Sequence, residues 1–231
     1  MKTLFEYFLE SLIEKSHLDK EMKFIESTCE ENADLIFSDD YENGKLLDFE
    51  DKKEFKDMFE DDYHIHYQIK YKDHILGVFG ISYFRDINKK INYIASWVLI
   101  HQLLHLIDKD KMFSNIKDNE LIDKTVYVDY LQINQYIKQD LDINHLAIIK
   151  AFFEKFIKLC KEKNIEYITA NGKNEKVTNL YVKIGNFTCF KKTYDNDIRN
   201  KFLYKITGGK GNTDIEKQLN AQLDSFVVKK I

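Results

Sequence analysis

The stretch over residues 126–190 constrains the fold of this chain more than any other part of it. Its apolar spacing alternates between strand and helix character, at 128–133, 145–160, 165–170, around 174–181 and from 187 onward. Strands that alternate with helices predict an α/β fold with a mixed sheet and at least one right-handed crossover.

The preceding residues supply further elements of the same kind. Residues 23–26 predict a short strand, and 29–37 a helix that the Thr28 hydroxyl can cap. Apolar residues then alternate with polar ones over 65–84, which predicts a hairpin. Gly77 and Gly80 within it indicate a bulge or a close backbone approach.

Composition limits the class of protein. Hydrophobic residues make up 44% of the 231 and aromatic residues 14%, which is typical of a globular chain. The net charge of −4 gives no electrostatic support for nucleic-acid binding. Three isolated cysteines favour a reduced, cytoplasmic protein, and Glu6, Glu10 and Glu14 interrupt any signal-peptide core. The longest apolar run, at 94–100, is too short to cross a membrane, so no membrane partner is expected.

Three segments lie outside the predicted central domain or interrupt it. Apolar residues at three- and four-residue spacing predict an N-terminal helix within 1–21. A second apolar segment, at 89–123, predicts a helical insertion between the third and fourth strands. After a last strand at 202–206, the segment 208–231 predicts a linker and a final helix that carries Phe226 and Val227 on its apolar face. The terminal helices or the helix at 89–113 are candidates for a homodimer contact.

Two histidine pairs raise the question of a metal. His64 and His66 share one strand face, but no third ligand is near them in the sequence. His101 and His105 lie one helical turn apart, the spacing of H-E-x-x-H zinc sites, but Gln102 stands where the glutamate base would be. We expect no metal; a metal-dependent hydrolase that uses His101 and His105 is the weakest of three hypotheses.

The segment 174–187 resembles a known family. The GNAT superfamily of acyl-CoA-dependent N-acyltransferases has a pattern of asparagine, Leu-Tyr, Lys and Gly-Phe. This segment is similar to that pattern at Asn174, Leu180-Tyr181, Lys183, Gly185 and Phe187, with one residue inserted before the phenylalanine. The resemblance implies a GNAT-like domain over 22–207, with its first strand and helix at 23–37 and its second and third strands at 65–84.

The same resemblance implies where a co-substrate, acetyl-CoA or another acyl-CoA, would bind. In the family, one strand splays from its neighbour and pairs with the pantetheine amides, and the next helix points its N-terminus at the pyrophosphate. Asp142 and Asn144 occupy positions where the family has glycine or alanine, so the pyrophosphate loop is degenerate. The implied cofactor-binding residues are Leu131, Ile133, Gln139, Leu141, Asp142, Ile143, Asn144, His145, Asn174 and Tyr181.

For the chemistry, Tyr181 matches the family's general acid, although a core tyrosine is an equal alternative. Tyr130 stands where many members have a glutamate, and Gln132, on the same strand face, cannot accept a proton. Strand alternation predicts that Asp129 points to the other face. The remaining candidates for the proton acceptor are His101, His105 and a base that acts through water.

These observations leave two main hypotheses about function. The first is a cytoplasmic N-acyltransferase that acts on an amine of a small molecule or a protein. Residues 39–62 contain eleven acidic residues against four lysines, a local charge of −7, which favours a cationic acceptor. The second is a binding or regulatory protein on a degenerate GNAT fold. Asp142→Gly with Asn144→Gly would raise the affinity for CoA under the second hypothesis.

Overall fold

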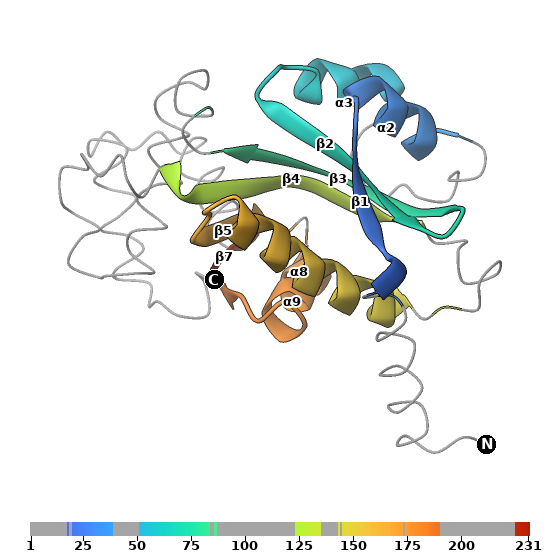
Figure 1. Ribbon diagram of the computed structural model, residues 1–231. Helices are drawn as coiled ribbons and strands as arrows, with labels where there is room; N and C mark the ends of the chain where they lie inside the picture. The colour runs from blue at the N-terminus through green and yellow to red at the C-terminus, as the bar shows by residue number, and fades with distance from the viewer. Residues whose placement is uncertain are drawn as a thin grey trace, which may run out of the picture. The chain divides into compact units, whose positions relative to one another are not determined.

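The computed structural model describes residues 18, 20–38, 51–83, 86, 123–134, 143, 145–172, 174–189 and 225–231. Its strands follow the order β1-β2-β3-β4-β5-β7-β6 in a seven-stranded mixed sheet, and the described residues include four helices (Figure 1). This confirms the predicted α/β class. The predicted helices at 1–21 and 89–123, the strand at 202–206 and the loop before residue 143 lie outside the described residues, apart from a few positions.

The chain divides into two compact units, of which the first covers 1–82 and 128–159. Its strands are β1 (Lys23–Ser27), β2 (His64–Tyr71), β3 (His74–Tyr83) and most of β4 (Thr125–Ile133). Strand β2 pairs antiparallel with both β1 and β3. Helices α2 (Cys29–Ile36) and α3 (Lys52–Phe59) lie on one face of these strands, and α8 (His145–Glu162) lies on the other (Figure 1).

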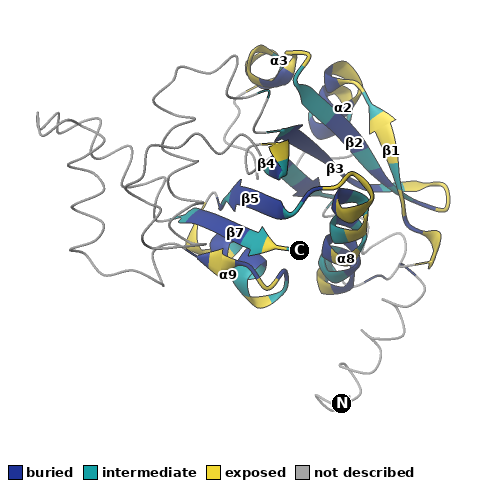
Figure 2. Ribbon diagram, turned by 60° about the vertical axis from the view of Figure 1, so that its left-hand side comes forward, coloured by how far each residue is buried: buried dark blue, intermediate teal, exposed yellow. Residues whose placement is uncertain are grey.

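The alternation of side chains along β3 builds a separate core on each face of the first unit. On one face the Phe79 ring lies 5.2 Å from Phe152 and 5.7 Å from Phe156 of α8. Val78, next to Phe79, belongs to the core under α2 and α3. Figure 2 shows β3 mostly buried and the outward faces of the helices exposed. The other members of the core under α2 and α3 are Cys29, Ala33, Ile36, Phe55, Phe59 and Tyr130.

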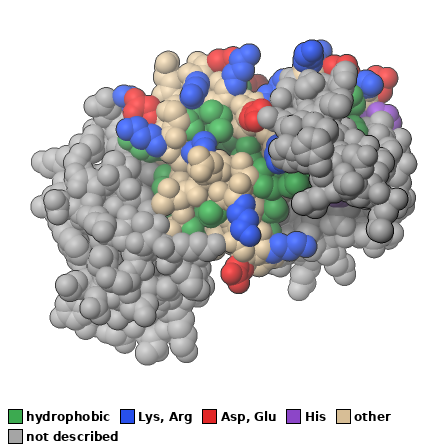
Figure 3. Space-filling model, turned by 90° about the horizontal axis from the view of Figure 1, so that it is seen from below, with side chains coloured by type: hydrophobic (Ala, Val, Ile, Leu, Met, Phe, Trp, Pro, Cys, Tyr) green, Lys and Arg blue, Asp and Glu red, His purple; other side chains and the backbone are tan. Residues whose placement is uncertain are grey.

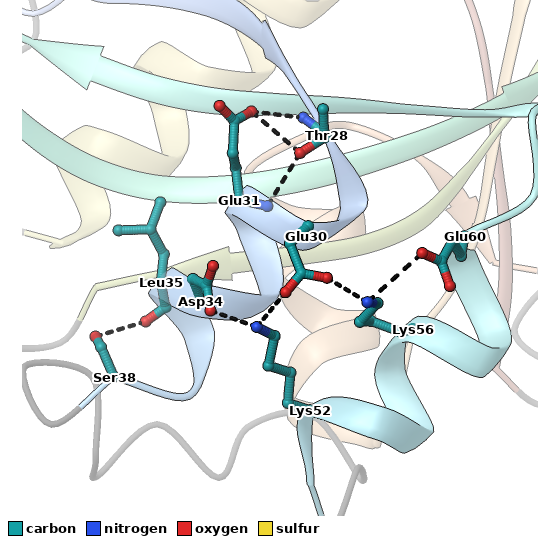
Figure 4. Close-up of polar contacts among 9 residues, drawn as sticks. All are labelled: Thr28, Glu30, Glu31, Asp34, Leu35, Ser38, Lys52, Lys56 and Glu60. Atoms are coloured by element: carbon teal, nitrogen blue, oxygen red, sulfur yellow. Dashed lines mark hydrogen bonds and ion pairs between the residues drawn. The ribbon is translucent and has the colours of Figure 1, made fainter.

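Local sequence explains the ends of these helices. Thr28 caps α2 as predicted: its hydroxyl accepts from the Glu31 amide at 3.1 Å, and the Glu31 carboxylate accepts from the Thr28 amide at 2.8 Å (Figure 4). The two bonds form a capping box, which satisfies two otherwise unpaired amides. Asp51 caps α3 with a single bond, in which its carboxylate accepts from the Glu54 amide at 2.9 Å.

Ion pairs join α2 to α3 at the surface. Glu30 of α2 accepts from both Lys52 and Lys56 of α3, Lys52 also reaches Asp34, and Lys56 lies 3.6 Å from Glu60 (Figure 4). These hydrogen bonds, from Lys52 first and then Lys56, hold the pKa of Glu30 below its usual range. Two of the four lysines in the acidic run at 39–62 are therefore paired with carboxylates.

The predicted hairpin is confirmed, and both of its glycines permit close approaches to β4. A Cβ on Gly77 would lie 2.3 Å from the Gln132 carbonyl oxygen, and a Cβ on Gly80 would lie 2.3 Å from the Tyr130 ring. Any larger residue would force these strands apart. A register shift also occurs between Ile69 and Lys70 of β2, so the hairpin contains both a close approach and an irregularity.

The second unit covers 83–127 and 160–231. It contains β5 (Tyr167–Asn171), α9 (Glu175–Lys183), β6 (Thr188–Cys189) and β7 (Phe226–Lys230), with β7 antiparallel to both β5 and β6. The prediction that the final helix includes Phe226 and Val227 is wrong. These residues begin a run of three buried side chains, Phe226 to Val228, that pairs with strands on both sides and has strong β-propensity.

The residue inserted into the 174–187 pattern has a structural role. Asn186 adopts the left-handed conformation, with φ 56°, which asparagine tolerates better than most residues. The turn lets the Phe187 amide donate to the Tyr181 carbonyl at 3.1 Å. Lys229 then donates to the carbonyls of Gly185, at 2.8 Å, and Asn186, at 3.2 Å. A cation therefore stabilises the C-terminal end of α9.

Candidate functional site

Three polar side chains of the first unit, His64, Ser82 and Asp129, form a group that we call the His64 cluster. The Ser82 hydroxyl donates to Asp129 Oδ2 at 2.7 Å, and its oxygen lies 2.8 Å from His64 Nδ1. His64 Nδ1 is 3.0 Å from the same Oδ2. The side chains of His64 and Asp129 are only 6% and 5% exposed, and Ser82 is fully buried. Water therefore screens these contacts little.

The hairpin register places the histidine beside the serine. His64 and Ser82 are directly opposite each other on β2 and β3, and His66 is opposite Gly80. Side chains of opposite residues project to the same face of a sheet. Asp129 completes the cluster from β4.

The geometry of the cluster assigns its protons. An ionised carboxylate can only accept hydrogen bonds, so the single hydroxyl proton of Ser82 belongs to its bond with Asp129. The Ser82 oxygen and the Asp129 carboxylate both then accept from His64, which requires a proton on Nδ1. Nε2 of His64 is buried and has no hydrogen-bond partner among the described residues. In the neutral imidazole this nitrogen carries an unused lone pair.

The cluster differs from the Ser-His-Asp arrangement of hydrolases. In that arrangement the serine contacts one imidazole nitrogen and the aspartate contacts the other, so that the histidine can take the serine proton. Here both Ser82 and Asp129 contact Nδ1 of His64. Ser82 is therefore not activated as a nucleophile, and the imidazole atom that stays available for a further contact is His64 Nε2.

A second set of hydrogen bonds, which we call the Tyr130 network, lies beside the cluster. Ser27 donates to Asn32 Oδ1 at 2.9 Å, and Asn32 Nδ2 donates to the Tyr130 hydroxyl at 2.9 Å. The Tyr130 hydroxyl lies 2.8 Å from His66 Nδ1, and His66 Nε2 lies 3.0 Å from the Phe59 carbonyl. Since a carbonyl only accepts, His66 carries its proton on Nε2 and accepts from Tyr130 on Nδ1.

His66 and His64 therefore hold opposite tautomers, although they are two residues apart on one strand. Burial is the largest cause that lowers the pKa of His66 below its ordinary value, which keeps the ring neutral. Burial also raises the pKa of the Tyr130 hydroxyl, so it remains a hydrogen-bond donor. Both nitrogens of His66 are occupied, and the pair His64 and His66 does not have the free nitrogens of a two-histidine metal site.

The structure places the predicted catalytic residues in buried positions. Tyr130 is 4% exposed and Gln132 is 1% exposed, both on the same side of β4. Tyr181 is 6% exposed, with its ring 5.2 Å from that of Phe187. Burial raises the pKa of Tyr181 above its ordinary value, which makes it a weaker acid and favours its interpretation as a core residue.

The described cofactor-binding candidates occupy several different environments. Leu131 and Ile133 are half-buried on β4, and Ile143 is buried. His145 donates through Nε2 to the Asn134 carbonyl at 3.1 Å. The remaining described candidate, Asn174, caps α9 by accepting from the Val177 amide at 3.0 Å. The candidates Gln139, Leu141, Asp142 and Asn144 lie outside the described residues, as do His101 and His105.

The prediction that Asp129 points away from the Tyr130 side is wrong. Its carboxylate meets Ser82, whereas the Tyr130 ring lies over Gly80, and residues 80 and 82 project to one face of β3. The consecutive residues Asp129 and Tyr130 therefore both reach this face, in a departure from strict alternation. Sequence reasoning singled out His64 only as a metal candidate, and it did not connect the histidine with Ser82 or Asp129.

The cysteines and the metal-ligand residues suggest no further site. All three cysteines are buried, and none forms a disulfide bond. Burial raises the pKa of Cys29 to about 11 and that of Cys160 to about 12, so neither is a thiolate at neutral pH. Among the described residues, no three His, Cys, Asp or Glu side chains are grouped to hold a metal ion. None of the described helices has the length and apolar character needed to cross a membrane.

Comparisons with known proteins leave the family open. No protein-family model matches the chain, and no curated protein matches it significantly.

Proposed function

We propose that this chain is a GNAT-type N-acyltransferase that moves an acyl group from acyl-CoA, in the first place acetyl-CoA, to an amine of a small molecule or protein. The order of elements supports the proposal. The elements follow one another in the order that the resemblance implies. They are a strand and a helix (β1, α2), a hairpin (β2, β3), a strand (β4), a long helix (α8), a strand (β5) and a short helix (α9). A cytoplasmic location is part of the same proposal.

The observation that carries the proposal is the connection between β4 and α8. The His145 imidazole in the first residue of α8 donates to the Asn134 carbonyl just after β4, at 3.1 Å. This bond fixes the N-terminus of the helix beside the end of the strand. The first turn of α8 contains no acidic residue, so no carboxylate in that turn neutralises the positive end of the helix dipole. Such an end attracts phosphate groups.

The direction of β4 suggests how the co-substrate would run along it. If the pyrophosphate lies at the N-terminus of α8, the pantetheine arm runs back along β4 past Ile133 and Leu131. The thioester then lies towards Asp129, two residues before Leu131 and about 7 Å further along an extended strand. The proposed reaction centre therefore falls at the part of β4 that carries the His64 cluster.

The alternative, a binding or regulatory protein on a degenerate GNAT fold, is favoured by one observation. Tyr181, the general acid implied by the resemblance, is buried and its pKa is raised. A protein that keeps the fold without the reaction has no need of an exposed acid at this position. The two proposals differ in their predictions for acyl-CoA.

Isothermal titration calorimetry with acetyl-CoA, CoA and pantetheine tests the proposed function. We expect CoA to bind more tightly than pantetheine, because only CoA offers phosphates to the α8 N-terminus. Product formation from acetyl-CoA and a panel of amines, detected by mass spectrometry, is the second readout. Absence of CoA binding at millimolar concentration would sink the proposal. In that case, CoA binding gained by Asp142→Gly with Asn144→Gly would support the alternative.

A further inference from the structure

The unpartnered Nε2 of His64 is the feature of the structure that most needs an explanation. Buried polar atoms are almost always hydrogen-bonded, and an exception calls for an explanation such as strain, a catalytic role, or a bound water or ion. Here the other imidazole nitrogen has two partners, Ser82 and Asp129, so the ring is firmly oriented. An oriented imidazole with one free, basic nitrogen is well suited to accept a proton.

We infer that His64 is the proton acceptor for the attacking amine, and that Asp129 and Ser82 are its positioning residues. The inference rests on the proposed function and names the base of that reaction. Asp129 holds the proton on Nδ1, which leaves the lone pair on Nε2, and its negative charge stabilises the imidazolium that forms. Among the described residues, the titratable groups around His64 are Asp129, the Tyr63 ring at 4.1 Å and the His66 ring at 6.3 Å.

The chemical step balances with His64 as the only proton carrier. The neutral amine attacks the thioester carbonyl carbon, so a C–N bond forms and the C–S bond breaks. Nε2 takes the proton from the attacking nitrogen, and the resulting imidazolium returns it to the leaving CoA thiolate. The products are an amide and free CoA, and His64 ends the cycle neutral.

The type of side chain favours an imidazole over the buried Tyr181 phenol for the second half of this step. As a class, an imidazolium, with an ordinary pKa of about 6.5, is a stronger acid than a thiol of about 8.5. A phenol, with an ordinary pKa of about 10, is a weaker acid than the thiol. Burial weakens Tyr181 further. One histidine therefore supplies both the base missing from β4 and the acid that Tyr181 is unsuited to provide.

The experiment compares wild type with His64→Gln, Asp129→Asn and the control His74→Gln, which changes an exposed histidine at the start of β3. Acetyl-CoA turnover is measured with butylamine as the acceptor, and CoA affinity is measured by calorimetry. We expect His64→Gln and Asp129→Asn to lower kcat/KM by about 10² to 10⁴-fold with unchanged CoA affinity. His74→Gln should keep the wild-type kcat/KM.

Imidazole nitrogen NMR of the wild type gives a readout that does not depend on turnover. We expect a protonated Nδ1 and a free Nε2 on His64, and the reverse on His66. The opposite tautomer on His64 would overturn the inference. So would a His64→Gln variant that binds CoA and keeps the wild-type kcat/KM, and this outcome would leave the proposed function standing. A wild type that binds no CoA would instead refute the proposed function, and the role of His64 with it.

Discussion

Tyr130→Phe removes one hydroxyl from the centre of the Tyr130 network. His66 Nδ1 loses its donor at 2.8 Å and is left buried without a partner, at a cost of about 1 to 3 kcal/mol. Asn32 Nδ2 loses its bond at 2.9 Å but still donates to the Tyr67 carbonyl at 3.3 Å. That second loss is limited to the net value of one hydrogen bond, about 1 kcal/mol. The variant should therefore lower the free energy of unfolding by about 2 to 4 kcal/mol.

Urea unfolding followed by circular dichroism measures this difference, with Tyr71→Phe as the matched control. Tyr71 is also a buried tyrosine, 7% exposed, and among the described residues its hydroxyl has no hydrogen-bond partner. Removing that hydroxyl should change the free energy of unfolding by less than about 0.5 kcal/mol, as for substitutions away from networks. If both variants lose equally little, the Tyr130 network contributes no stability and the argument for it is refuted.

Two further predictions follow from neighbouring contacts. Gly80→Ala would place a Cβ 2.3 Å from a Tyr130 ring that Phe55 and Phe59 hold in place, and urea unfolding should show a loss of about 1 to 3 kcal/mol; unchanged stability would contradict the close approach. Because burial lowers the pKa of His66, the unfolded chain takes up a proton below about pH 6.5 when the folded chain does not. Wild type should then lose stability as the pH falls from about 6.5 towards the folded-state pKa of His66, by up to about 1.4 kcal/mol per pH unit. His66→Gln should lack this contribution, and parallel stability curves for the two proteins would show that His66 does not titrate as argued.

The described residues expose few large hydrophobic side chains that could form a binding surface. Only three large hydrophobic side chains are exposed among them, Ile25 at 41%, Met58 at 53% and Leu146 at 38%. They lie on three different elements, β1, α3 and α8. On the face seen in Figure 3, hydrophobic side chains form small groups bordered by lysine. The expected homodimer contact concerned the terminal helices and 89–113, which lie almost entirely outside the described residues.

Local patterns in the sequence were sufficient for most of the elements. The Thr28 cap, the two-residue period of the hairpin and the helix that begins at His145 all depend on residues within about four positions of each other. The structure confirms each of them. The failure at Phe226 and Val227 has the same origin, because their apolar spacing continues a helical stripe. Only pairing with β5 and β6 reveals them as a strand.

The hairpin shows why the site needed the tertiary structure. Tyr71 and His74 form the residue pair next to the turn of the β2–β3 hairpin. If the pairing continued from there without a register shift, His64 would lie opposite Ile81. The register shift between Ile69 and Lys70 sets it opposite Ser82 instead. Gly77 and Gly80 predicted an irregularity or a close approach in this hairpin, but they could not locate the shift. A displacement of one residue thus replaces an apolar neighbour of His64 with a hydroxyl.

The sequence by itself determined the α/β class, the Thr28 cap of α2 and the hairpin, because these follow from the periodicity and chemistry of neighbouring residues. Only the tertiary structure decided which side chains meet. His64 and Asp129 are 65 positions apart, and Asn32 and Tyr130 are 98 apart. Their contacts depend on strand register, on which face each residue takes and on burial between a sheet and its helices, and none of these is written in local spacing. The same burial leaves His64 Nε2 without a partner, and that nitrogen is the atom on which the proposed chemistry depends.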